Sequence, residues 1–126
     1  MVYDAGALVA ADRGAQHFRA LHQRWITFDV SPVVPSPVLT QVWQDGVRQA
    51  RIARTLRACR VLPTSEDLAK HAGVLLGRSR TTDAVDAIVV ATAIRYDAIV
   101  VTTDPDDLRH LWDAAGTGFE IGLVVP

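Results

Sequence analysis

The sequence is poor in cysteine and contains no long apolar run. Its single cysteine, Cys59, excludes an internal disulfide and a cysteine-rich metal site. No stretch is apolar for long enough to cross a bilayer or to act as a secretory signal, so we expect a cytoplasmic protein without membrane contact. The formal net charge is only -1, which does not indicate a general binder of nucleic acids.

Hydrophobic residues are abundant, at 49% of the 126 residues, and 21% are charged. This composition suits one domain with a single core, and no linker or repeat divides residues 1–126. Predicted strands alternate along the chain with predicted helices. The alternation predicts an α/β fold, a three-layer sandwich with a five-stranded, mainly parallel sheet, whose strands fall at residues 1–3, 30–35, 60–63, 98–101 and 119–125.

Capping residues and breakers set the expected helix bounds. Asp4 is expected to cap a helix over residues 5–11, and capping alone would explain an Asp there. Ser36 is the predicted cap of a later helix, with Pro37 in the first turn of that helix. A further helix is expected over residues 47–58, and residues 77–82 read as a polar loop.

Acidic residues gather in the stretch from Asp83 to Asp107. Asp83 and Asp86 are three residues apart, so on a helix they share a face, about 4.5 Å apart along the axis. The apolar run at residues 98–101 is typical of a central parallel strand and ends next to Asp104, where an open α/β sheet usually places its site. Several unpaired carboxylates held together must bind protons or a metal ion.

Three features stand out in order along the chain: Asp4, the run VDAIVVATA at residues 85–93, and the run VTTDPDDL at residues 101–108. In these features the sequence resembles the PIN-domain family, and in particular the VapC-like ribonuclease toxins of type II toxin-antitoxin systems. In that family, acids on these elements surround one or two Mg²⁺ or Mn²⁺ ions. The resemblance implies that Asp4, Asp86 and Asp104 are catalytic and bind metal, and it makes Asp83 an additional metal ligand.

The sequence departs from the family pattern at Gln41, which stands where the family usually has Glu. An amide oxygen can ligate a hard cation, but it brings no negative charge and cannot act as a general base. We therefore expect weaker metal binding, unless Asp83 supplies the missing charge. A second departure is Ala5-Gly6 in place of the small hydroxyl residue that often follows the first Asp.

The resemblance implies a metal-dependent endoribonuclease. Its substrate would be RNA, and its partners a small antitoxin, which inserts a peptide into the acidic pocket, and a second copy of the chain in a homodimer. Thr103 could orient a ligand or a water, and Arg13, Arg78 and Arg80 could hold flanking phosphates, although solvent exposure alone would explain those arginines.

Two other functions remain open at this point. The domain could be non-catalytic, with acids that only cap helices and a task of binding RNA or an antitoxin, and Gln41 supports this alternative. Clustered acids at strand ends would also suit a phosphoacceptor domain. That alternative is disfavoured, because the only lysine, Lys70, lies in a predicted helix and not near the last strand.

Overall fold

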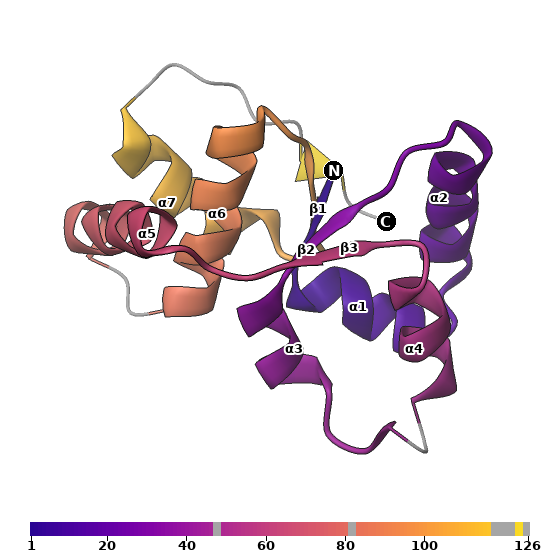
Figure 1. Cartoon of the computed structure of the whole chain (residues 1–126). Helices are drawn as coiled ribbons and strands as arrows, with labels where there is room; N and C mark the ends of the chain where they lie inside the picture. The colour runs from indigo at the N-terminus through magenta and orange to yellow at the C-terminus, as the bar shows by residue number, and fades with distance from the viewer. Residues whose placement is uncertain (47–48, 81–82, 117–122, 125–126) are drawn as a thin grey trace.

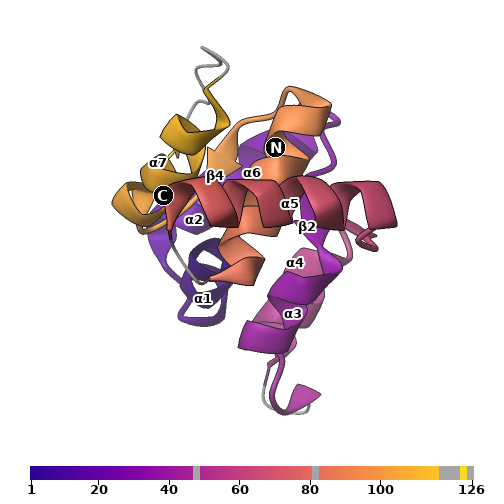
Figure 2. The same cartoon turned by 90° about the vertical axis from the view of Figure 1, so that its left-hand side faces the viewer.

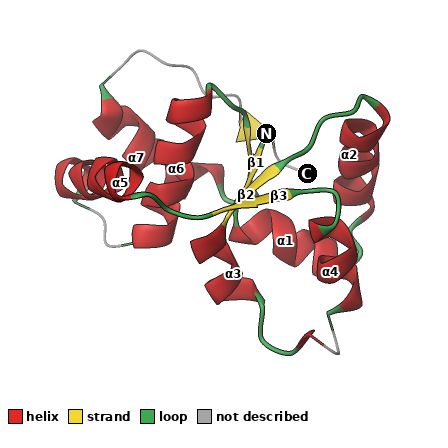
Figure 3. Ribbon diagram, in the orientation of Figure 1, coloured by secondary structure: helices red, strands yellow, loops and turns green. Residues whose placement is uncertain are grey.

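The protein folds into alternating strands and helices (Figure 3). The structure is a computed structural model that describes residues 1–46, 49–80, 83–116 and 123–124. The elements are β1 (Val2–Tyr3), α1 (Ala5–Asp12), α2 (Gln16–Thr27), β2 (Val33–Pro35), α3 (Ser36–Val42), α4 (Ala50–Leu56), β3 (Arg60–Leu62), α5 (Glu66–Ser79), α6 (Ala84–Tyr96), β4 (Val100–Val101), α7 (Pro105–Ala115) and β5 (Leu123–Val124).

The sheet lies between two layers of helices, as Figure 1 shows. Its strands run in the order β3-β2-β1-β4-β5, and each neighbouring pair is parallel. Helices α1, α2 and α4 lie on one face, whereas α5, α6 and α7 pack together on the other. Helix α3 continues from β2 and contacts both α1 and α6. These layers confirm the predicted α/β sandwich with its parallel sheet.

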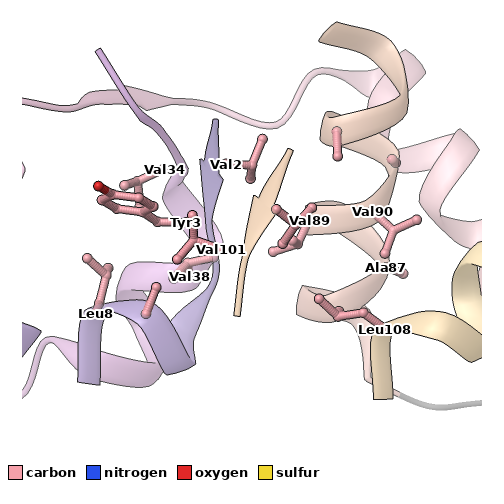
Figure 4. Packing of buried hydrophobic residues seen from close by; sticks show 14 of the residues in the cluster. Val2, Tyr3, Leu8, Val34, Val38, Ala87, Val89, Val90, Val101 and Leu108 are labelled. Atoms are coloured by element: carbon pink, nitrogen blue, oxygen red, sulfur yellow. The ribbon is translucent and has the colours of Figure 1, made fainter. Parts of the chain in front are cut away.

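Residues of β1 alternate between the two layers, as expected for a strand covered on both faces. Figure 4 shows Val2 directed toward α6 and Tyr3 toward α1. The Tyr3 ring is fully buried, meets the edge of Phe18 at 5.3 Å between ring centroids, and its hydroxyl lies 2.7 Å from His22 Nδ1. The strand therefore anchors both halves of the core, and its C-terminal end holds Asp4 in place.

Helix α6 is apolar on nearly all sides because the sheet covers one side and α5 and α7 cover others. Ala87, Val89, Val90, Ala91 and Ala93 are all buried. The helix has 13 residues. Among the described residues, no helix combines the length and the apolar character that a membrane span requires.

Several predicted element bounds are wrong. Helix α3 begins at Ser36 itself, with Pro35 in the cap position, so Ser36 is not the cap. Helix α4 spans Ala50–Leu56 and Gln49 before it is not helical, whereas residues 47–48 of the predicted helix lie outside the described residues. Helix α5 continues through Ser79, so residues 77–79 are helical, and it ends at Arg80 with φ 56°. The second strand begins at Val33, because the Val30 N–H still bonds to the Trp25 carbonyl at the end of α2. Of the predicted last strand, residues 119–122 and 125 lie outside the described residues.

The side chain of Gln49, the residue before α4, bonds to the backbone at the end of α3. Its Nε2 donates to the Val42 carbonyl at 2.6 Å, and its Oε1 accepts from the N–H groups of Gln44 and Asp45 at 2.9 and 3.2 Å. Gln49 thus satisfies three backbone groups that would otherwise lack these partners at the end of α3.

We expect Gln49→Ala to lower the free energy of unfolding by about 1 to 3 kcal/mol, because it removes a largely buried amide that bonds to three backbone groups. Urea denaturation measures the change. Gln41→Ala is the matched control: its side chain is exposed, so it should stay within about 0.5 kcal/mol of the wild type. Equal losses in the two variants would contradict this role for Gln49.

Candidate metal centre

Asp4 is held at the junction of β1 and α1. It adopts an extended backbone conformation, and its Oδ1 accepts from the Ala7 N–H at 2.9 Å, so it caps α1 as expected. Only 6% of the residue is exposed. Burial is the largest of the effects that raise the pKa of this carboxyl, and the charge of Asp104 adds to it, whereas hydrogen bonds from Thr102 and from the backbone at Ala7 and Gly6 act in the opposite direction.

Thr102 joins the first acidic segment to the last one. It directly follows β4, it is fully buried, and its hydroxyl bonds to the Asp4 carboxylate. The same Oγ1 accepts from the Asp104 N–H at 3.0 Å. One hydroxyl therefore donates to one acid and fixes the backbone of another.

The two predicted acids of α6 do not both lie within the helix. Asp83 is the N-cap residue, and its Oδ1 accepts from the Asp86 N–H at 3.0 Å. Asp86 lies in the first helical turn and is half-buried. Burial is the largest cause that raises the pKa of Asp86 to about 7, followed by the negative charges of Asp83, Asp4 and Asp107 and a side-chain hydrogen bond with Asp83.

Helix α7 repeats the same arrangement of acids. Asp104 is its N-cap residue, and Asp107 follows three residues later in the first turn. Both side chains are exposed. A hydrogen bond to Asp104 and the charge of Asp104 raise the pKa of Asp107. Two helices thus begin with an acid at the cap and another one turn later, which is the spacing of a capping box.

The mutual effects on pKa show that acids from three helix starts lie within electrostatic reach of one another. Asp86 of α6 responds to Asp4 and Asp107, while Asp4 and Asp107 both respond to Asp104. In the described part of the chain, none of these carboxylates forms an ion pair with Lys or Arg. We call the five residues Asp4, Asp83, Asp86, Asp104 and Asp107 the acidic cluster.

The acidic cluster fits a hard divalent cation in ligand type and in charge. Carboxylate oxygens are the ligands that Mg²⁺ and Mn²⁺ prefer, and the N-terminal ends of α1, α6 and α7 stabilise only part of the negative charge. Within the described residues, however, no three acidic, His or Cys side chains stand where they could hold one ion. Mutual repulsion favours separated carboxylates, and a bound cation would reverse that preference.

Comparisons with known proteins decide the family. The model of the PIN domain matches residues 1–111. The chain belongs to the PIN domain family. None of the curated proteins compared with it matches. A toxin-antitoxin complex from Klebsiella pneumoniae contains a chain of similar fold, with a TM-score of 0.73 and 19% identity, over 99% of this PIN domain and 96% of that chain.

The other residues that the sequence predicted for the site lie at different distances from the acidic cluster. Gln41 lies exposed on the last turn of α3, a helix that packs against α1 and α6. Arg13 ends α1, about 13 Å along the axis from Asp4, so the structure does not bring it to the acidic cluster. Arg78 and Arg80 are exposed at the end of α5, shortly before α6 in the chain.

Sequence reasoning missed Thr102 and Asp107. The sequence favoured Thr103, but this residue is exposed. The hydrogen bond to Asp4 comes from Thr102 instead. The alternation of side chains along β4 was the available signal for Thr102, since a buried polar residue at a strand end needs a partner. The signal for Asp107 was its three-residue spacing from Asp104, which repeats that of Asp83 and Asp86.

Gly6 lets the residue Thr103, which follows β4, pack closely against the start of α1 in this PIN domain. A Cβ on Gly6 would overlap the Thr103 hydroxyl and would lie 3.3 Å from both Asp4 Oδ1 and the Thr103 backbone nitrogen. The absence of a side chain, and not a hydroxyl, is therefore what this position contributes.

We expect Gly6→Ala to destabilise the fold by about 1 to 3 kcal/mol and to weaken Mn²⁺ binding, because the Thr103 hydroxyl must turn away and the Asp4 carboxylate and the Thr103 backbone must give way slightly. Thermal unfolding with and without Mn²⁺ measures both effects. Gly73→Ala on α5 is the control: nothing lies within 4 Å of its new methyl group, so a gain of up to about 1 kcal/mol is expected. A Gly6→Ala protein as stable as Gly73→Ala would show that the close approach is unimportant.

Proposed function

We propose that this PIN domain is a metal-dependent endoribonuclease of the VapC-like toxin type. Membership of the PIN family supports nuclease chemistry. The observation that carries the proposal is Asp86, whose pKa is raised to about 7 by burial, by Asp83 at the cap of the same helix and by acids from two other helix starts. A fold gains no stability from crowding carboxylates in this way, so the arrangement supports a function that needs their oxygens.

Each acid has a proposed role. Asp4 and Asp86 would hold the principal ion, because the fold orients one by hydrogen bonds and half-buries the other. Asp104 would be a further ligand or would position the attacking water, and Asp83 would supply the charge that Gln41 lacks. When bound, Mg²⁺ or Mn²⁺ polarises the scissile phosphate, lowers the pKa of the attacking water and stabilises the leaving 3′-oxygen.

Cleavage of a structured RNA by the purified protein tests the proposal. We expect cleavage with Mn²⁺ or Mg²⁺, none after EDTA, and recovery when the metal is restored. Products should be resolved on a denaturing gel. Cleavage that persists in EDTA would contradict the metal dependence, and a metal-bound protein that leaves every tested RNA intact would contradict the nuclease.

A non-catalytic PIN domain is the second candidate function, and the exposed amide of Gln41 favours it. In that case the protein would bind RNA without cutting it. Gln41→Glu separates the two functions, since it restores an acid at the position where the family usually has one. A large gain of cleavage from an inactive wild type would favour the non-catalytic domain. The phosphoacceptor function gains no support, since Lys70 pairs with Glu66 at 3.6 Å on the exposed side of α5.

An antitoxin is the proposed protein partner, because the similar fold from Klebsiella pneumoniae was solved as a toxin-antitoxin complex. An Arg of such a partner would be attracted to the acidic cluster. A hollow of about 460 Å³ offers the antitoxin a second surface. It is positively charged, unlike the acidic cluster, since its lining residues include Arg19, Arg51 and Arg54. The homodimer implied by the family resemblance stays a prediction.

Coexpression with the product of a short neighbouring reading frame tests the partner. We expect a complex that survives gel filtration and suppresses cleavage. Reversing the charge of the hollow with Arg51→Glu and Arg54→Glu should weaken that complex. A complex insensitive both to these changes and to loss of the acids would place the partner elsewhere.

A further inference from the structure

An exposed indole directly follows α3, the helix that packs against α1 and α6. Trp43 follows α3, and its backbone N–H donates to the Leu39 carbonyl at 2.8 Å. Of the whole residue, 42% is exposed. Within the described residues 36–46 and 49, Trp43 is the only large apolar residue that is exposed. Its described neighbours Gln41, Gln44 and Asp45 are polar and exposed.

The indole is held by the turn that follows it. A Cβ on Gly46 would lie 2.8 Å from Cζ2 of Trp43, so only a glycine allows the ring to pack this closely on the backbone. Gln49 fixes the same turn through its bonds to the backbone of Val42, Gln44 and Asp45. The ring is therefore oriented by tertiary contacts, which lowers the entropy cost of stacking a ligand on it.

Helix α3 lies on the side of the sheet where the acidic cluster lies. The helix starts where β2 ends, at the same edge of the parallel sheet as Asp4. It packs against α1, which Asp4 caps, and against α6, whose first turn carries Asp86 (Figure 2). Its seven residues extend about 10 Å from that edge. Trp43 thus stands about one helix length from the acidic cluster.

We propose that Trp43 is a stacking platform for an unpaired base of the RNA strand whose phosphate lies at the acidic cluster. The inference rests on the proposed nuclease function and extends it, because it assigns the contact that holds the flanking nucleotide. A base presents a flat π-face to an indole whatever its identity, and the phosphate and sugar beside it suit the polar neighbours Gln41 and Gln44. A second copy of the chain is the competing occupant of this ring, and the experiment below separates it from RNA.

Binding of a fluorescent single-stranded RNA oligonucleotide tests the platform. The assay contains Ca²⁺, and a denaturing gel checks that the RNA stays intact, so that binding is measured separately from cleavage. We expect Trp43→Ala to weaken binding about tenfold, within the range of one base stack, and Trp43→Phe to retain most of the affinity. Phe28→Ala is the control, because Phe28 is 69% exposed at the end of α2 and should be neutral.

Each outcome separates the platform from its alternatives. Unchanged affinity of Trp43→Ala overturns the platform and leaves the nuclease standing. A smaller sedimentation coefficient of Trp43→Ala, with affinity per protomer unchanged, overturns it in favour of a contact between copies. A wild type that binds no RNA overturns both proposals. RNA binding that depends on an aromatic ring at position 43, without any cleavage in Mn²⁺, supports the platform and contradicts the nuclease.

Discussion

Asp86→Asn should lower the rate of RNA cleavage at least about 100-fold. Removing one carboxylate from the metal site forfeits transition-state charge stabilisation of several kcal/mol, and each 1.36 kcal/mol corresponds to a tenfold change in rate. Single-turnover cleavage at saturating Mn²⁺ measures the chemical step. Asp113→Asn, a change at an exposed acid far along α7, is the matched control and should keep wild-type activity.

The same substitution should stabilise the metal-free protein at pH 7.5. The folded pKa of Asp86 is about 7 against an ordinary 3.8, so the native state binds more protons than the unfolded state between those values. The free energy of unfolding therefore falls as pH rises from about 4 through about 7, and Asn removes this loss. Because the carboxyl is only half-buried, we expect a gain of about 2 kcal/mol, less than its full pKa shift would give.

Melting curves across pH 4 to 8 in EDTA check the sign of this effect. The advantage of Asp86→Asn over the wild type should vanish near pH 4 and grow toward pH 8, and Mn²⁺ should reduce it by stabilising the wild type more than the variant. A variant that is less stable than the wild type at every pH would mean that Asp86 serves the fold, and inactivity would then have no bearing on metal.

Thr102→Val should reduce cleavage about 10- to 100-fold, the usual cost of losing a residue that orients a metal ligand. Valine keeps the shape of the buried side chain but loses the hydroxyl that donates to Asp4 and accepts from the Asp104 N–H. Both acids then lose their relative positions, and the pKa of Asp4 should rise, since the bond from Thr102 lowers it.

Thr102→Ser is the matched variant for this prediction. It restores the hydroxyl at the cost of one methyl group, so it should recover most of the activity while losing stability in the core. The apparent affinity for Mn²⁺ should follow the hydroxyl and not the volume of the side chain. If Thr102→Ser is as inactive as Thr102→Val, packing at the end of β4 is what matters.

The layers of the fold were predictable because local patterns and tertiary burial agree. The unbroken apolar run before Thr102 predicted a central strand, and β4 is the neighbour of β1 in the parallel sheet. The position of Asp4 between a strand and a helix predicted its cap, and the structure adds that its carboxylate also bonds to Thr102. One position thus serves both the helix and the acidic cluster.

The turn between α3 and α4 was not predictable from local signals. A helix that includes residue 49 is reasonable by propensity, but Gln49 is not helical and bonds back across seven residues to Val42. Thr102 escaped notice for a similar reason, because its partner Asp4 is almost 100 positions away in the chain. Long-range hydrogen bonds leave no periodic trace in a sequence.

Calorimetric titration with Mn²⁺ tests most directly whether the acidic cluster holds a divalent cation. The wild type should bind Mn²⁺ at pH 7.5, with release of protons from carboxyls of raised pKa, and Asp4→Asn and Asp86→Asn should each weaken that binding at least about tenfold. Absence of binding at millimolar Mn²⁺, or binding that neither substitution changes, would contradict a metal centre at these residues.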